Sequence, residues 1–149
     1  MGHPSPVALI RNLLLGALVL ASLHAGAREA AANPLVGLWV FESASYELPE
    51  ACNKAYLNFL DHYRIEGSDG VRKGVLEYSL EQVASGRGYN LIVKRISNDG
   101  NPSCYGREAA TQDPEELLFF YVMLSPDGGR MKFYLSNDAF HGYRRVLDP

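Results

Sequence analysis

Short motifs that mark catalytic or metal sites are missing from this sequence. It contains no G-x-S-x-G nucleophile turn, no H-E-x-x-H zinc helix, no phosphate-binding P-loop and no calcium loop. The stretch Gly67-Ser68-Asp69-Gly70 is typical of a turn, and no predicted helix follows Gly86-Arg87-Gly88, as a phosphate cradle would require. His62 and His141 lie in different segments. We therefore expect a protein that is not an enzyme and has no metal site and no cofactor, with a hydrolase of unrecognised site as the least favoured alternative.

Clusters of positive charge are missing as well. The chain has 14 Lys and Arg against 17 Asp and Glu, a net charge of −3 at pH 7, and no basic block is longer than two residues. Binding to nucleic acid phosphates needs a clustered cationic surface. The composition thus excludes nucleic acid as a partner and indicates no particular ligand.

Long apolar runs are limited to one stretch near the start. Arg11 precedes the apolar run Leu13–Leu23, and the small residues Ala25-Gly26-Ala27 follow it. This is the pattern of a signal peptide, and the run is shorter than the roughly 20 residues that cross a bilayer. We expect residues 1–27 to be cleaved, with the cut between Ala27 and Ala32. The protein would then be exported, to the periplasm or outside the cell, with no membrane insertion.

Cysteine is scarce, with only Cys52 and Cys104. In an oxidising compartment an isolated pair is most simply one disulfide, here closing a loop of about fifty residues that contributes roughly 4 kcal/mol to stability. Free buried thiols or a metal site are the alternatives. The spacing is unlike that of a zinc site.

Aromatic residues are plentiful, with nine Tyr, six Phe and one Trp. They indicate a folded domain, because disordered chains lack such residues. Residues 28–35 are rich in alanine and are expected to form a flexible arm, and residues 36–149 a single domain.

Seven stretches alternate between apolar and polar residues or are dense in β-formers, as strands are. They are 36–42, 55–65, 71–83, 89–97, 117–124, 130–136 and 140–147. An eighth, short strand is expected around Cys104–Tyr105, and a helical turn or two at Pro49–Lys54 or Asp113–Glu116. Turns are predicted at 66–70, 85–88, 98–100 and 125–129. The pattern favours an all-β fold, an up-and-down antiparallel barrel of about eight strands.

Two features at the ends of this domain resemble the lipocalin/calycin barrels. Gly37-Leu38-Trp39 lies on the first predicted strand, and Arg144 and Arg145 lie on the last. The resemblance implies that Gly37 lets the chain turn into the barrel floor and that Trp39 covers this floor. Arg144 or Arg145 would then stack on the indole as a cation–π contact. It also implies a monomeric binding protein for a small apolar or anionic ligand or for a protein partner.

The chain is also similar to small periplasmic metalloprotease-inhibitor barrels. Those proteins carry a leader, an N-terminal arm, G-x-W on the first strand and a cysteine soon afterwards, as Cys52 is here. The resemblance implies an alternative function, a periplasmic protease inhibitor whose arm, residues 28–34, enters the active-site cleft. The late position of Cys104 departs from that family, in which the bridge is local.

Candidate ligand residues follow from the strands. Tyrosines that fall on extended stretches could line a cavity with apolar faces and hydroxyl groups. They are Tyr63, Tyr78, Tyr89, Tyr121 and Tyr134, with Tyr56 and Tyr143 in the same pattern. The alternative is that they are ordinary core or outer-face residues.

Paired cations offer a second candidate. Arg72-Lys73, Lys94-Arg95 and Arg144-Arg145 are adjacent residues, and neighbours on a strand point to opposite faces. One member of a pair within a strand must therefore point inward, where it needs an acid, an aromatic face or an anionic ligand. An anionic head group at the barrel mouth is one interpretation, and solvated strand ends are the other.

Overall fold

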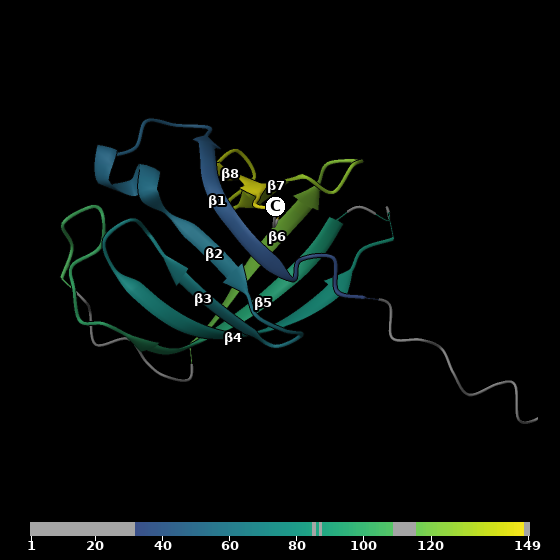
Figure 1. Ribbon diagram of the computed structural model, residues 1–149, viewed down its shortest axis with the longest axis horizontal. Coiled ribbons are helices and arrows are strands. Elements are labelled where there is room, and N and C mark those ends of the chain that lie inside the picture. The colour runs from purple at the N-terminus through teal and green to yellow at the C-terminus, as the bar shows by residue number, and fades with distance from the viewer. Residues whose placement is uncertain (1–31, 85, 87, 109–115, 148–149) are drawn as a thin grey trace, which may run out of the picture. The chain divides into compact units, whose positions relative to one another are not determined.

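Eight antiparallel strands close into a barrel in the computed structural model, which describes residues 32–84, 86, 88–108 and 116–147 (Figure 1). Each strand is hydrogen-bonded to the next along the chain, and the last pairs with the first. The strands are β1 (Gly37–Ala44), β2 (Tyr56–Phe59), β3 (Arg64–Ser68), β4 (Lys73–Gln82), β5 (Gly88–Asn98), β6 (Leu117–Leu124), β7 (Arg130–Tyr134) and β8 (Phe140–Arg145). The prediction of an all-β, up-and-down barrel is confirmed.

The stretch 55–65, expected as one strand, is two strands joined by a tight turn at Asp61. One oxygen of the Asp61 carboxylate accepts hydrogen bonds from the backbone N–H groups of Tyr63 and Arg64, at 2.9 and 2.8 Å. This side-chain-to-backbone capping reverses the chain where alternation alone suggested that it continued. Residues 66–68, predicted as a turn, belong to β3 as a result.

The short strand expected around Cys104–Tyr105 is not formed. The N–H of Ser103 donates to the carbonyl of Arg107 at 2.7 Å, and the N–H of Gly106 donates to the carbonyl of Ser103 at 2.8 Å. These bonds close a local turn and leave no ladder to a neighbouring strand. The eighth strand of the barrel comes from the division of 55–65 instead.

A disulfide joins Cys52 to Cys104, with an S–S distance of 2.09 Å and 5.1 Å between the Cα atoms. Cys52 lies on the 3-10 helix η1 (Glu50–Lys54), in the connection between β1 and β2, where a helical turn was expected. Cys104 lies in the connection between β5 and β6. The predicted bridge is confirmed, and it links two connections at the same end of the barrel, which we call the mouth.

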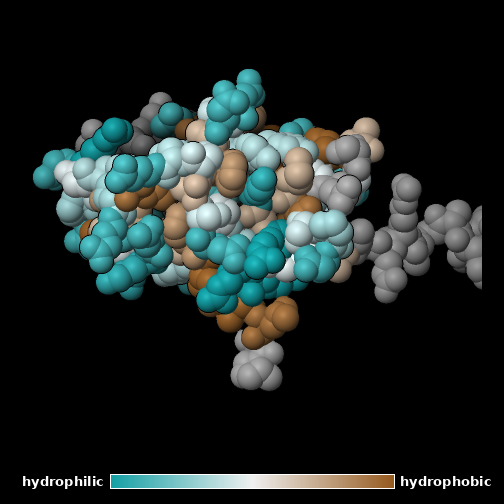
Figure 2. Space-filling model, turned by 90° about the horizontal axis from the view of Figure 1, so that it is seen from above, coloured by the Kyte–Doolittle hydropathy of each residue, from teal (hydrophilic) through white to brown (hydrophobic). Residues whose placement is uncertain are grey.

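Alternation along the strands places apolar side chains inside the barrel and the residues between them outside. The largest fully buried side chains are Trp39, Phe59, Leu35, Ile65, Leu91, Met131 and Val122. Hydrophilic residues cover much of the face drawn in Figure 2, where hydrophobic residues are scattered apart from a group at the lower edge. The core is therefore the barrel interior, and most of it is filled by side chains.

Trp39 closes the end of the barrel opposite the mouth, which we call the floor. Its side chain is fully buried, and its Nε1 donates to the carbonyl of Leu35 at 2.7 Å. The Arg145 guanidinium lies over the indole, 4.6 Å from the ring centroid, and donates to the carbonyl of Pro34. Of the two candidate arginines, Arg145 makes the predicted contact. Arg144 precedes it on β8 and is exposed on the outer face.

Residues 33–35, assigned to the N-terminal arm, are packed against the barrel. The Leu35 side chain is completely buried. The Asn33 side chain donates to the Tyr78 hydroxyl at 2.6 Å and accepts from the N–H of Leu35 at 2.9 Å. Residues 33–35 therefore form part of the barrel floor rather than a free arm. We call them the floor plug, because the Leu35 side chain packs next to Trp39 and completes the core.

Several expectations fall on residues outside the described part of the chain. They are the signal peptide 1–27, arm residues 28–31, Ser85 and Arg87 of one expected turn, and residues 113–115 of one expected helical turn. In the described residues, no helix combines the length and apolar character needed to cross a membrane.

Candidate functional site

A cavity of about 220 Å³ opens inside the barrel near the mouth. Its walls come from β2, β3, β4, β5 and β8 and from the β3–β4 connection, and we call it the mouth cavity. It is lined by Leu57, Gly67, Ser68, Asp69, Arg72, Lys73, Gly74, Leu76, Arg95, Asn98 and Tyr143. Charged and polar groups thus meet a small apolar wall at the open end of the core.

Two glycines that face each other provide the space. Gly67 on β3 pairs directly with Gly74 on β4, and both positions alternate with core residues. A Cβ at Gly74 would lie 2.9 Å from the carbonyl oxygen of Ser97, and one at Gly67 would lie 3.2 Å from a methyl group of Leu57. Larger residues would therefore fill the cavity and crowd the neighbouring strands.

A β-bulge at Ile96 turns two polar side chains of β5 toward the cavity. Leu76 pairs with Arg95, and Gly74 pairs with Asn98, so two steps on β4 correspond to three on β5. Leu76 packs against the core, and cross-strand partners share a face. Arg95 and Asn98 consequently both line the interior, and the prediction that one member of the Lys94-Arg95 pair points inward is confirmed.

Arg72 and Arg95 bring two positive charges to the cavity. Burial lowers the pKa of Arg95, and the nearby charge of Arg72 lowers it further, so the two guanidinium groups repel each other. Glu116 opposes this effect, but it forms no ion pair within 4 Å of Arg95. In the described part of the chain, Arg95 has no hydrogen-bond or ion-pair partner.

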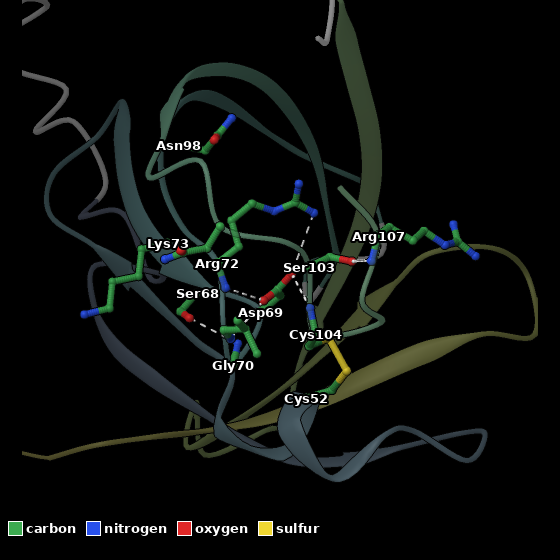
Figure 3. Close-up of polar contacts among 12 residues, drawn as sticks. Cys52, Ser68, Asp69, Gly70, Arg72, Lys73, Asn98, Ser103, Cys104 and Arg107 are labelled. Atoms are coloured by element: carbon green, nitrogen blue, oxygen red, sulfur yellow. Dashed lines mark hydrogen bonds and ion pairs between the residues drawn. A yellow bond between two sulfur atoms is a disulfide. The ribbon is translucent and has the colours of Figure 1, made fainter. Parts of the chain in front are cut away.

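The one carboxylate of the cavity is already engaged, as Figure 3 shows. Asp69 accepts hydrogen bonds from the backbone N–H groups of Val71, Arg72 and Cys104, at 3.0, 2.9 and 3.2 Å. It also lies 3.8 Å from the Arg72 guanidinium. Asp69 therefore fixes the rim and balances one of the two arginines, and the cavity keeps a net positive charge.

Near Arg72, the edge of the barrel mouth is held together by contacts between the β1–β2, β3–β4 and β5–β6 connections. The β3–β4 turn packs so closely on η1 that a Cβ at Gly70 would lie 1.9 Å from the carbonyl oxygen of Ala51. The disulfide ties η1 to the β5–β6 connection, and Asp69 ties that connection back to the β3–β4 turn. Arg72 is thus held in position before any ligand arrives, which lowers the entropic cost of binding.

The opposite side of the mouth is aromatic and uncharged at neutral pH. Burial raises the pKa of the Tyr143 phenol well above its usual range, with smaller effects from Tyr46 and Tyr105. Partial burial, with a hydrogen bond to Tyr105, raises the pKa of Tyr46 to about 12. The Tyr46 hydroxyl lies 2.8 Å from Nε2 of His141, whose pKa burial lowers. None of these groups brings a negative charge that would oppose an anion.

The five tyrosines selected from the sequence lie outside the mouth cavity. Tyr63 is 56% exposed in the Asp61 turn. The Tyr78 hydroxyl donates to the Asp61 carbonyl, so it belongs to the floor, and Tyr89 packs against the core. Tyr121 and Tyr134 pair on the outer face with their rings 5.7 Å apart.

Tyr78 and Tyr89 thus face the core, whereas Tyr121 and Tyr134 lie on the outer face. On β6 and β7 the inward positions belong to Phe120, Val122 and Phe133, and period-two alternation leaves the tyrosines outside. Tyr143, which shared the pattern, does line the mouth cavity. Of the paired cations, Arg72, Lys73 and Arg95 line this cavity.

The two histidines of the domain, His62 and His141, lie at opposite ends of the barrel. His62 is exposed in the Asp61 turn at the floor end, whereas His141 begins β8 at the mouth and contacts Tyr46. No group of three or more His, Cys, Asp or Glu side chains within the described ranges could hold a metal ion. The arrangement at the mouth suits the binding of an anion.

Comparison with known proteins gives no match, either to a protein-family model or to a curated protein or solved structure.

Proposed function

We propose that this protein is an exported, lipocalin-like binding protein that holds a small organic anion in the mouth cavity. The head group, a carboxylate or a phosphate or sulfate ester, accepts hydrogen bonds from Arg72 and Arg95. The adjoining apolar part contacts Leu57, Leu76 and Tyr143. The protein acts by binding and carries out no reaction.

The proposal depends on the environment of Arg95. A half-buried guanidinium beside a second arginine, with no acidic partner in the described chain, is electrostatically unfavourable until an anion joins it. Arginine also presents a fixed fork of donors that matches planar or tetrahedral oxyanions. An anion between the two guanidinium groups would relieve their repulsion and accept hydrogen bonds from both.

The size of the cavity limits the ligand. At about 220 Å³ it is smaller than the roughly 300–1,000 Å³ of drug-sized pockets, and the core below it is filled by side chains. The site therefore suits a compact anion with one ring or a short chain. A long apolar ligand would find no room inside the barrel.

The floor and the disulfide support the lipocalin-like and exported parts of the proposal. Trp39 and Arg145 make the contact that the resemblance implies. A disulfide fits an oxidising compartment outside the cytoplasm. The inhibitor alternative needs a free arm, and the packing of Leu35 and Asn33 shortens the segment that could enter a cleft.

The test is isothermal titration with matched ligands. We expect benzoate to bind and benzyl alcohol, its uncharged counterpart, not to bind. Arg95→Gln should weaken benzoate binding by on the order of 10- to 100-fold, since one charge-assisted hydrogen-bonding group is lost. Arg95→Lys should lie in between, because a point charge replaces a fork of donors.

Arg144→Gln is the matched control, because Arg144 is an exposed arginine on the outer face of β8. It should bind benzoate like the natural protein. Native mass spectrometry of protein from its exporting host would identify an anion that co-purifies. The proposal fails if Arg95→Gln binds anions as tightly as the natural protein, or if no carboxylate, phosphate or sulfate ester binds at all.

A further inference from the structure

The outer wall of the barrel carries a second and larger hollow, of about 480 Å³. It lies over β5, β6, β7, β8 and β1, and we call it the wall groove. Tyr143 is the one residue that it shares with the mouth cavity, and the side chain of Tyr143 belongs to the core. The two hollows are therefore separate sites on different faces of the sheet.

One row of residues across five strands forms the base of the wall groove. Cross-strand pairing aligns Gly88, Met123, Lys132, Gly142 and Ser43. The row faces outward, because the alternate positions on β6, β7 and β8 belong to the core. Gly88 is covered by Tyr121 and Gly142 by the Ser43 side chain, and the exposed Met123 and Lys132 stand between them.

Aromatic rings form one side of the wall groove, and an ion pair forms the other. Tyr121 lies over Gly88, where a Cβ would come within 2.0 Å of its hydroxyl oxygen, and Phe140 stands across the sheet from it. On the other side the Arg130 guanidinium pairs with the Glu42 carboxylate at 3.0 Å. The ion pair satisfies both of its charges, so it closes the groove without offering a free charge to a ligand.

Lys132 is the remaining charge in the wall groove. Its ammonium nitrogen lies 4.6 Å from the centroid of the Phe140 ring, which holds the cation beside the apolar surface. Within the residues that the structure describes, no carboxylate pairs with it. The groove thus combines an apolar wall with one uncompensated positive charge.

The charge, volume and topology together indicate the occupant. The volume lies within the range of small-molecule pockets, unlike that of the mouth cavity. The barrel is closed, so no strand edge is free to add a peptide strand. We propose that the wall groove binds an amphiphilic monoanion, such as a medium-chain fatty acid, with its carboxylate at Lys132 and its chain along Met123, Tyr121 and Phe140.

Methionine methyl NMR tests this directly, because the exposed side chain of Met123 lies in the groove. Met123 is 39% exposed, whereas Met131, which also lines the groove, is 1% exposed with its side chain in the core. With dodecanoate as the probe, we expect the Met123 methyl signal to shift and saturate, and that of the buried Met131 to shift less. Lys132→Gln, a change at an exposed position, should weaken binding about fivefold, the effect of losing one solvent-accessible ion pair. Lys132→Arg should restore it.

The mouth variant Arg95→Gln separates this proposal from the proposed function. It should leave the Met123 response to dodecanoate intact even though it weakens benzoate binding. The groove proposal is overturned if Met123 does not respond, if Arg95→Gln abolishes the response, or if Lys132→Gln binds as the natural protein does. It is also overturned if the Met123 signal moves with protein concentration in the absence of dodecanoate, which would assign the groove to a second copy of the chain.

Discussion

Arg145 pairs with Trp39 across the seam between β8 and β1, and its guanidinium lies over the indole ring. The two residues stand near opposite ends of the barrel's sequence, so the contact forms only when the barrel closes. The same guanidinium also holds the carbonyl of Pro34, next to the fully buried Leu35. One side chain thereby joins the first strand, the last strand and the floor plug.

Loss of this side chain should destabilise the barrel. Arg145→Ala removes the cation–π contact and a charged hydrogen bond, and we expect the free energy of unfolding to fall by about 2 kcal/mol. Urea unfolding followed by the fluorescence of Trp39, the single tryptophan of the chain, gives the value. Arg144→Ala, at an exposed position on the same strand, should change it by less than about 0.5 kcal/mol. Equal effects at the two positions would contradict the role given to Arg145.

Removal of the disulfide should lower stability and loosen the mouth. The bridge spans 52 positions in the sequence, and constraint of the unfolded chain predicts a loss of about 4 kcal/mol for the Cys52→Ala, Cys104→Ala double variant. Dithiothreitol should reduce the stability of the natural protein to a similar level and leave the double variant unchanged. Because η1 would be released from the β5–β6 connection, benzoate binding should weaken as well. Unchanged unfolding of the natural protein under reducing conditions would show that the bridge adds little.

Gly70 should be the least replaceable glycine of the rim. It has a φ of +110°, and an added Cβ would lie 1.9 Å from the carbonyl oxygen of Ala51, so Gly70→Ala suffers both backbone strain and a clash with η1. We expect a loss of about 3 kcal/mol or more.

Gly37 provides the matched control for Gly70. Its φ is +126°, but a Cβ there would meet no atom within 4 Å. Gly37→Ala should therefore show the strain alone, about 1–2 kcal/mol in the same thermal or urea unfolding measurement. If the two variants lose equal stability, the close packing of the β3–β4 turn on η1 contributes nothing.

The barrel could be predicted from the sequence because strands and turns follow local rules. Strand alternation and turn residues each need only a few neighbouring residues, whereas the contact between Trp39 and a terminal arginine at the floor was implied by the resemblance to lipocalin barrels. The error at 55–65 arose because β2 and β3 are short, and the side chain of Asp61 reverses the chain within an alternating pattern. Alternation alone does not detect such a turn.

The mouth cavity could be predicted only in part. The paired cations indicated that a member of Lys94-Arg95 points inward, since neighbours on a strand face opposite ways. The position of Asn98 depends on the bulge at Ile96, and the hollow depends on Gly67 facing Gly74 across two strands. Both are consequences of strand register, which composition and local pattern do not specify.

His141 should make stability depend on pH between about 7 and 5. Burial lowers its pKa in the folded protein, whereas an unfolded chain has the ordinary value of about 6.5. Below that value the unfolded state binds more protons, so the stabilising effect of a neutral His141 is full at higher pH and is lost as the pH falls. The neighbouring side chains Tyr46, Phe41 and Tyr143 are uncharged in this range and do not favour an imidazolium.

The His141→Asn variant isolates this effect. At pH 7.5 it should be less stable than the natural protein by about 1 kcal/mol, because the hydrogen bond to Tyr46 is lost. The difference should shrink as the pH is lowered to 5, since only the natural protein loses the contribution of a neutral imidazole. Urea unfolding at half-unit pH steps measures the difference, with His62→Asn at the exposed turn as the control. A difference that grows toward pH 5 would mean that the folded barrel favours the charged form of His141.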